Sequence, residues 1–319
     1  MSFNYIRHIE LEILVDNEVI RIPSDGSRNT LGIDFYIYKT LVGLPDESQV
    51  KIYNCSPEFI QRIVPPRKDF VKINIYAGYL NAGYTGSNVP NKTTHMVGSG
   101  LAVRIIPERN GVNNSVTISL LDNFDVLLLS DISKTYAPNT AVKDVVLDLV
   151  SGFKGVIVDE RAIMIDGVIG QKEFVAFGKI SKVLDDLAKQ YNFSWHIFSG
   201  TFTATKDNQR NPQARNFSVS YKKKNLLKAT PILGTGYQQI IGMKIQAMLE
   251  PTCRAGDVID LESEFFPQYN SSYLIHTLEM TGSTQSKDWK MAINSLNIAK
   301  IQSWTPASSK PTTPFSSQS

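Results

Sequence analysis

The feature that most constrains the fold of this chain is a two-residue alternation of apolar and polar side chains. Successive side chains of a β-strand point to opposite faces, so this period predicts half-buried strands. The clearest example is 69–77, where Val71, Ile73, Ile75 and Ala77 share one side. The first third also predicts strands at 6–15, 19–23, 31–40, 48–53, 94–106 and 115–121. Short strands with turn signals between them favour a sandwich or a barrel.

The middle third follows a helical period instead. The segment 180–191 carries one apolar stripe, formed by Ile180, Val183, Leu184, Leu187, Ala188 and Tyr191. A second helix is expected after Thr140, with its end at Gly152. The residues 193–205 read as a hairpin with a glycine turn. This third therefore predicts a small α+β module, and we expect its bounds to be 125–210.

The last third returns to the two-residue period, which predicts a second set of strands at 243–249, 257–262, 272–281 and 288–296. The fold class expected is mainly β with an α+β insert between two β-barrel domains. The predicted domains are 1–124 for the first barrel, 211–303 for the second, and 304–319 for a Pro/Ser/Thr-rich tail. Such a tail composition is typical of segments that form no core.

Composition and charge exclude several broad classes. Hydrophobic residues make up 42% and charged residues 20% of the chain, which is globular composition. The 33 basic and 30 acidic residues give a balance too mild to imply nucleic-acid binding. Cys55 and Cys253 are predicted to be reduced, structural thiols, which suits assembly in a cytoplasm. We expect neither a signal peptide nor a membrane-spanning helix.

No catalytic or metal-binding motif is recognisable. None of the four histidines belongs to a zinc-ligand spacing: His8, His95, His196 and His276. His8 is expected on the solvent side of its strand. The glycines of 98–100 and 234–236 do not complete a phosphate-binding fingerprint and are interpreted as turn residues. We therefore expect no catalytic residue, no cofactor and no metal.

The acidic and basic clusters have structural interpretations. Asp185 and Asp186 are adjacent on a helix, where neighbouring side chains diverge by about 100° and cannot share a substrate. Glu262 and Glu264 could share a strand face, and a solvated face is the simpler explanation. The run 222–224 is three lysines; it is either a solvated turn or a contact for DNA or an acidic partner.

Several predicted strands carry apolar or aromatic residues on both faces. Tyr36 and Tyr38 lie opposite Phe35 and Ile37 within one strand. A half-exposed antiparallel sheet needs only one apolar face. The second face is therefore expected to pack on another domain or subunit.

Four ordered stretches resemble the central hub proteins of phage tail baseplates, the family that includes late control protein D. They are 50–59 with 70–79, 117–122, 178–188 with Trp195, and 227–231 with 243–249, 255–258 and 289–291. The first carries a strand, a short helix and an Ala-Gly-Tyr turn. Together the stretches span about residues 45–295, and the tail after Trp304 departs from the pattern.

The resemblance implies a structural, non-enzymatic hub. Its two barrels would resemble the tail-tube subunit, and three protomers would form a pseudo-sixfold ring between the tail tube and the central spike. The implied partners are further copies of the chain (a homotrimer), the tail tube or tube-initiator protein, the spike and other baseplate proteins. DNA would only pass through the lumen, and the chain would not insert into a membrane. The implied location is the virion tail baseplate, assembled in the host cytoplasm.

Three alternatives stay open at this stage. A tail-associated peptidoglycan or glycan hydrolase requires two carboxylates across a cleft. A free-standing carbohydrate- or protein-binding β protein requires a stable monomer. A hub of a related contractile injection system has the same sequence features as a phage hub. The tail 304–319 is hypothesised to reach a spike or a neighbouring baseplate protein.

Overall fold

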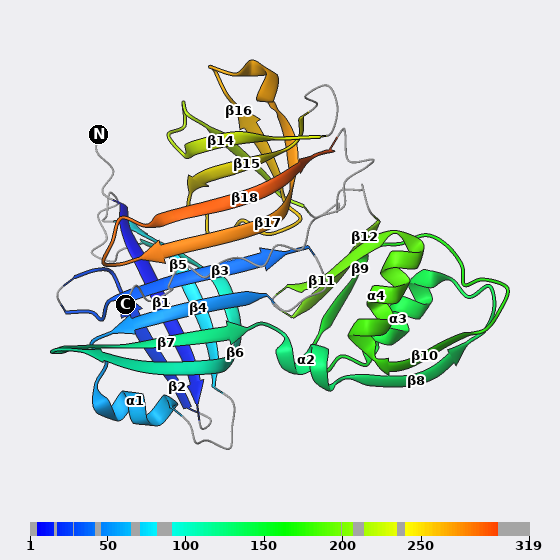
Figure 1. The fold of residues 1–319 in the computed structure, drawn as a ribbon, viewed down its shortest axis with the longest axis horizontal. Helices are drawn as coiled ribbons and strands as arrows, with labels where there is room; N and C mark the ends of the chain where they lie inside the picture. The colour runs from blue at the N-terminus through cyan, green and yellow to red at the C-terminus, as the bar shows by residue number, and fades with distance from the viewer. Residues whose placement is uncertain are drawn as a thin grey trace.

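β-strands dominate the computed structural model of the chain, so the mainly β fold with an α+β insert is confirmed (Figure 1). The structure describes residues 5–15, 18–27, 29–41, 46–64, 71–81, 91–198, 200–206, 214–234 and 240–298. The hypothesis for the tail 304–319 lies outside these residues. The expected domain bounds stay a prediction.

The first third forms seven strands and one short helix. The helix begins where the sequence indicates, because the Ser56 side chain accepts the Phe59 backbone N–H at 3.2 Å and Pro57 occupies the first turn. The elements are β1 (Tyr5–Val15), β2 (Glu18–Ser24), β3 (Ile33–Thr40), β4 (Glu47–Tyr53), α1 (Pro57–Ile63), β5 (Lys72–Asn81), β6 (Asn91–Asn110) and β7 (Asn113–Leu121).

The middle third forms the α+β insert. Its helix α4 buries the predicted stripe, and Asn192 ends it in the left-handed conformation at φ 54°. Strands β8, β9 and β10 were not expected from the sequence. The elements are α2 (Phe124–Leu129), β8 (Asp131–Tyr136), α3 (Val142–Ser151), β9 (Ile157–Met164), β10 (Phe174–Lys179), α4 (Ile180–Tyr191), β11 (Phe193–Phe198) and β12 (Thr201–Lys206).

The last third returns to the main sheet. Its elements are β13 (Asn216–Ser220), β14 (Leu226–Leu233), β15 (Ile240–Met248), β16 (Val258–Glu262), the 3-10 helix η1 (Pro267–Tyr269), β17 (Ser271–Ser283) and β18 (Trp289–Asn297). Strand β17 pairs with β3, and this contact joins the first and last thirds into one sheet. The path through that sheet runs β14-β15-β18-β17-β3-β4-β7-β6-β5-β1-β2.

The two-sided apolarity of β3 follows from its central place. Strand β3 lies between β4 and β17, where Ile37 is opposite Ser48 and Met280. Phe35, Tyr36 and Ile37 are all buried, so both faces of the strand are covered within the chain. One hydrophobic core is shared by the strands of the first and last thirds, and the insert has a separate core. The insert lies beside the two groups of strands (Figure 1).

Gly282 on β17 leaves room for two aromatic rings of the shared core. A Cβ at this position would overlap the Phe35 ring and touch Trp289. Overpacking a core costs about 1–3 kcal/mol, so we expect Gly282→Ala to lower the free energy of unfolding by that amount. Urea denaturation measures the change. Gly170→Ala, where no atom lies within 4 Å, is the matched control; equal unfolding midpoints for the two variants would contradict the prediction.

Candidate functional site

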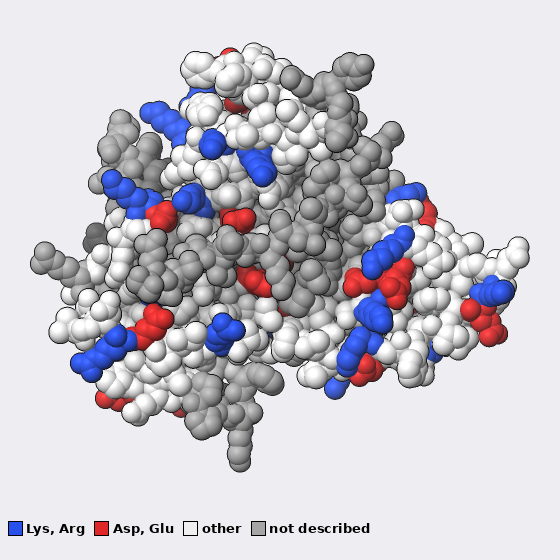
Figure 2. Space-filling model, in the orientation of Figure 1, with Lys and Arg blue, Asp and Glu red and all other residues white. Residues whose placement is uncertain are grey.

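Charges of both signs alternate over the surface of the insert. Figure 2 shows Lys and Arg side chains beside Asp and Glu on this lobe. Two of the pairs are Lys134 with Asp148 at 2.7 Å and Lys179 with Asp131 at 2.9 Å. Nucleic-acid binding requires a patch or stripe of one sign. The visible face of the insert therefore offers no such stripe.

The insert meets the main sheet at Phe198, the last residue of β11. The Lys39 Nζ atom lies 3.8 Å from the centroid of the Phe198 ring, and the Arg254 guanidinium carbon lies 4.5 Å from it. Lys39 belongs to β3 and Arg254 to the loop before β16. The Phe198 ring of the insert therefore contacts both the first and the last third of the chain. Cation–π contacts of this kind contribute more when they are shielded from water. We call Lys39, Phe198 and Arg254 the junction.

Behind the junction, Lys39 is buried with two carboxylates, Asp46 and Asp122. Asp46 accepts the Thr40 backbone N–H at 3.3 Å, and Asp122 accepts the Ser99 hydroxyl at 3.0 Å. Burial raises the pKa of Asp46 to about 7 against the opposing effect of Lys39, and it also raises the pKa of Asp122. The same burial lowers the pKa of the Lys39 ammonium. Lys39, Asp46 and Asp122 thus form a charge cluster that is buried inside the protein.

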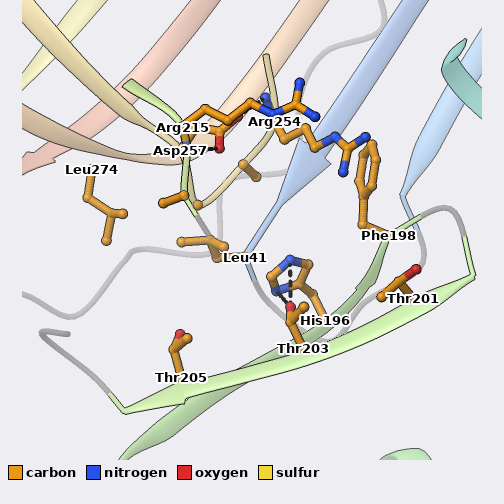
Figure 3. A pocket seen from close by; sticks show the side chains of 13 residues that line it. Leu41, His196, Phe198, Thr201, Thr203, Thr205, Arg215, Arg254, Asp257 and Leu274 are labelled. Carbon is orange, nitrogen blue, oxygen red and sulfur yellow. Dashed lines mark hydrogen bonds between the residues drawn. The ribbon is translucent and has the colours of Figure 1, made fainter. Parts of the chain in front are cut away.

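A cavity of about 310 Å³ opens beside the junction, between β12 and the loop that carries Arg254 (Figure 3). Asp46 and Asp122 do not line it. Hydrolysis of a glycoside needs two carboxylates facing a substrate across a cleft. Asp257, whose pKa is also raised by burial, is the one carboxylate among the described residues that lines the cavity, so no facing pair of carboxylates is present there.

His196 lies in this cavity and is neutral at physiological pH. Burial, together with the charge of Lys39, lowers the pKa of His196 to about 4. Its two ring nitrogens lie 3.1 and 3.0 Å from the Thr203 hydroxyl oxygen, which can pair with either tautomer. The sequence pattern assigns His196 no role, because the residues around it come from distant segments.

The other histidines are separate from this cavity, and one prediction for them was wrong. His8 is 6% exposed, not on the solvent side of β1. It pairs with the buried Gly78 of β5, and the alternation rule fails here because His8 and Ile9 are both covered. His95 is exposed on β6, and His276 lies on β17. Within the described ranges, no three His, Cys, Asp or Glu side chains gather in a way that could hold a metal.

The acidic and basic clusters noted in the sequence either support packing or lie exposed on the surface. Asp185 accepts the Trp195 indole N–H at 3.0 Å, so it supports the insert core. Glu262 and Glu264 are both exposed. The lysines of 222–224 form an exposed turn after β13, next to a ring contact between Tyr221 and Phe265.

The glycine and cysteine candidates also show no binding geometry. Gly98 and Gly100 lie within β6, and Gly234 follows β14, while position 236 lies outside the described residues. Cys55 and Cys253 are buried free thiols whose pKa values are raised by burial, to about 11 for Cys55. A raised pKa leaves the thiolate scarce and the thiol unreactive.

Large apolar side chains are exposed on the insert and at the ends of the sheet. Val175 and Phe177 on β10 and Leu129 on α2 are 64%, 78% and 74% exposed. Val112, at the β6–β7 turn, and Phe265 are also exposed. Apolar side chains grouped on a surface are typical of protein–protein contact sites. Among the described residues, no helix is long and apolar enough to cross a membrane.

Comparison with known proteins identifies the fold. No family model matches the chain, and no curated protein matches it. A tail protein of Neisseria meningitidis has a similar structure, with TM-score 0.61 and 8% identity over 92% of this chain and 98% of its own. The 43 kDa tail protein of prophage MuSo2 from Shewanella oneidensis gives TM-score 0.61, 10% identity and the same coverages.

A third solved structure comes from a secretion system. It is an E. coli component of the type VI secretion system, described as structurally similar to T4 bacteriophage tail proteins. Its TM-score is 0.57 at 9% identity, over 89% of this chain and 78% of its own. At these identities the likeness establishes the fold alone. The resemblance to tail hub proteins drawn from the sequence is confirmed at that level.

Proposed function

We propose that this chain is a structural baseplate hub of a phage tail. The observation that carries the proposal is the end-to-end likeness to two tail proteins, which covers 92% of this chain and 98% of each of theirs. Two groups of strands joined into one sheet fit a protomer that contributes two similar units to a ring. Three such protomers would give a pseudo-sixfold ring that joins the tail tube to the central spike.

The proposed partners follow from this arrangement. They are further copies of the chain, the tail tube or tube-initiator protein, the spike, and other baseplate proteins. DNA passes only through the lumen, and the chain acts in the virion tail after assembly in the host cytoplasm. Closed rotational assembly covers apolar patches that a monomer would expose, and β10 with α2 supplies such a patch. The proposed role is non-enzymatic, in line with the likeness to tail proteins.

A hub of a related contractile injection system is the second candidate. It is favoured by the likeness to the E. coli type VI secretion component. A Francisella PdpA-VgrG complex also gives TM-score 0.57, over 98% of this chain and 61% of the matched chain. Both candidates predict the same ring and differ in the particle that contains it.

The ring is tested by the mass of the purified chain. We expect light scattering at micromolar concentration to give three times the 35.6 kDa protomer mass, because an obligate interface of about 2,000–5,000 Å² holds at such dilution. Negative-stain images should then show rings with a central opening. A stable monomer would contradict the proposal, and a zymogram with clear peptidoglycan hydrolysis would favour the enzymatic alternative.

A further inference from the structure

At the cavity beside the junction, two arginines have guanidinium donors that make few hydrogen bonds to described residues. The Arg254 guanidinium contacts the Phe198 ring but makes no hydrogen bond to any described residue. The Arg215 side chain makes one long bond, from Nη1 to the Thr252 carbonyl at 3.5 Å. A guanidinium has five N–H donors in a planar fork. Two arginines at one cavity therefore leave most of their donors available to a ligand.

Backbone hydrogen bonds anchor the two arginine segments beside the cavity. The Asp257 carboxylate accepts the backbone N–H groups of Arg215 and Arg254, each at 2.9 Å. Both arginine segments are thus tied to one buried residue. The carboxylate also lines the cavity and attracts both guanidinium groups, but its hydrogen bonds to the two arginines go to their backbone N–H groups.

The opposite wall adds hydroxyl groups. Thr201, Thr203 and Thr205 alternate along β12 and line the same cavity (Figure 3). Thr203 is engaged with the His196 ring, whereas the hydroxyls of Thr201 and Thr205 make no hydrogen bond to described residues. Figure 3 shows both arginine side chains on the other side of the cavity, with the Arg254 guanidinium beside the Phe198 ring.

Apolar side chains complete the lining of the cavity. Leu41 and Leu274 face the cavity, and the ring of Phe198 closes one end (Figure 3). A cavity of about 310 Å³ lies at the lower end of the range for ligand sites. A bare inorganic anion would satisfy the arginines and leave the apolar lining unused. The ligand that fits both parts has a carboxylate and an adjoining apolar group.

We propose that this cavity binds an acidic peptide segment of a partner protein. A carboxylate of the segment would pair with Arg254 and Arg215, and a neighbouring apolar side chain would lie against Leu41 and Leu274. Arginine and carboxylate form paired, charge-assisted hydrogen bonds, which are stronger than bonds between neutral groups. The site is formed within one protomer, so the proposal does not depend on the ring.

Isothermal titration calorimetry of the full chain tests the proposal with three probes. They are acetyl-Leu-Glu-Leu-amide, its glutamine counterpart acetyl-Leu-Gln-Leu-amide, and inorganic phosphate. We expect the glutamate peptide to bind about tenfold to a hundredfold more tightly than the glutamine peptide, as charged hydrogen bonds imply. Phosphate should bind more weakly than the glutamate peptide because it gains nothing from the apolar lining.

Variants locate the binding in the cavity. Arg254→Met should weaken binding of the glutamate peptide at least about tenfold, and Thr205→Val should weaken it by a smaller factor. Arg109→Met, on the exposed β6–β7 hairpin, is the matched control and should leave the affinity unchanged. If Arg254→Met unfolds the chain, Arg215→Met serves the same purpose.

Any of four results would overturn the proposal. They are no binding of the glutamate peptide up to about 10 mM, equal affinity for the two peptides, phosphate binding as tight as the glutamate peptide, and unchanged affinity in a folded arginine variant.

Discussion

Replacing Lys39 with methionine should lower the free energy of unfolding by about 3–5 kcal/mol at about pH 8. The substitution removes the cation from the buried cluster, which leaves Asp46 without an opposing positive charge and Asp122 with only the smaller effect of Lys72. It also removes the contact of Lys39 Nζ with the Phe198 ring. Breaking a buried ion pair on one side is costly because the remaining charge is desolvated and unpaired.

The loss should depend on pH. Burial raises the pKa of Asp46 to about 7 even with Lys39 present, and without the lysine the value would rise further. Between the unfolded value of about 3.9 and the folded one, the folded state binds more protons than the unfolded state, so stability falls as pH rises. The cost of Lys39→Met is therefore largest above the further raised pKa that Asp46 has in the folded variant, and it shrinks toward about pH 5.

Urea denaturation at several pH values measures this effect. The double variant Lys39→Met with Asp46→Asn should recover part of the loss, since it removes the carboxylate that the single substitution leaves without a cation. Lys244→Met, on an exposed position of β15, is the matched control and should change stability by less than about 0.5 kcal/mol. A small, pH-independent loss in Lys39→Met would show that the cluster is not held by charge.

The position of Lys39 illustrates what the sequence could and could not predict. The alternation in β3 places Lys39 on the same face as Phe35 and Ile37, so an inward-facing lysine was visible in the pattern. Its two acidic partners come from the segment before β4 and from the end of β7, and no local pattern links them to β3. The cavity residues are equally dispersed, which explains why the candidate site was not found from the sequence.

The local period of apolar residues predicts an element correctly where that element buries one face. Helix α4 was predicted from its stripe, and its bounds are Ile180–Tyr191. Strands β8 and β10 were missed because they pair only with each other in the described sheets, and β10 exposes Val175 and Phe177. The strands predicted at 69–77 and 94–106 have shifted ends, since β5 continues to Asn81 and β6 begins at Asn91. These strands are determined by pairing with partners far along the chain.

Trp195→Ala should destabilise the insert and spare the main sheet. The Trp195 indole packs on the Phe202 ring at a centroid distance of 5.9 Å and donates to Asp185 at 3.0 Å. Truncating a buried tryptophan costs about 3–5 kcal/mol. The insert has its own hydrophobic core, so most of this loss should be confined to that core. The partly buried Asp185 carboxylate also loses its donor.

Hydrogen exchange followed by mass spectrometry separates the two cores. In Trp195→Ala, amides of the insert should exchange faster, whereas those of β3 and β17 keep their protection. Trp289→Ala is the matched variant, because Trp289 packs against Phe35 at 6.2 Å in the shared core. Truncating Trp289 should speed amide exchange in strands of both the first and the last third, since these strands share one sheet and one core. Faster exchange of β3 in Trp195→Ala would mean that the junction transmits unfolding from the insert to the main sheet. An effect of Trp289→Ala that is limited to the last third would mean that the two groups of strands unfold separately.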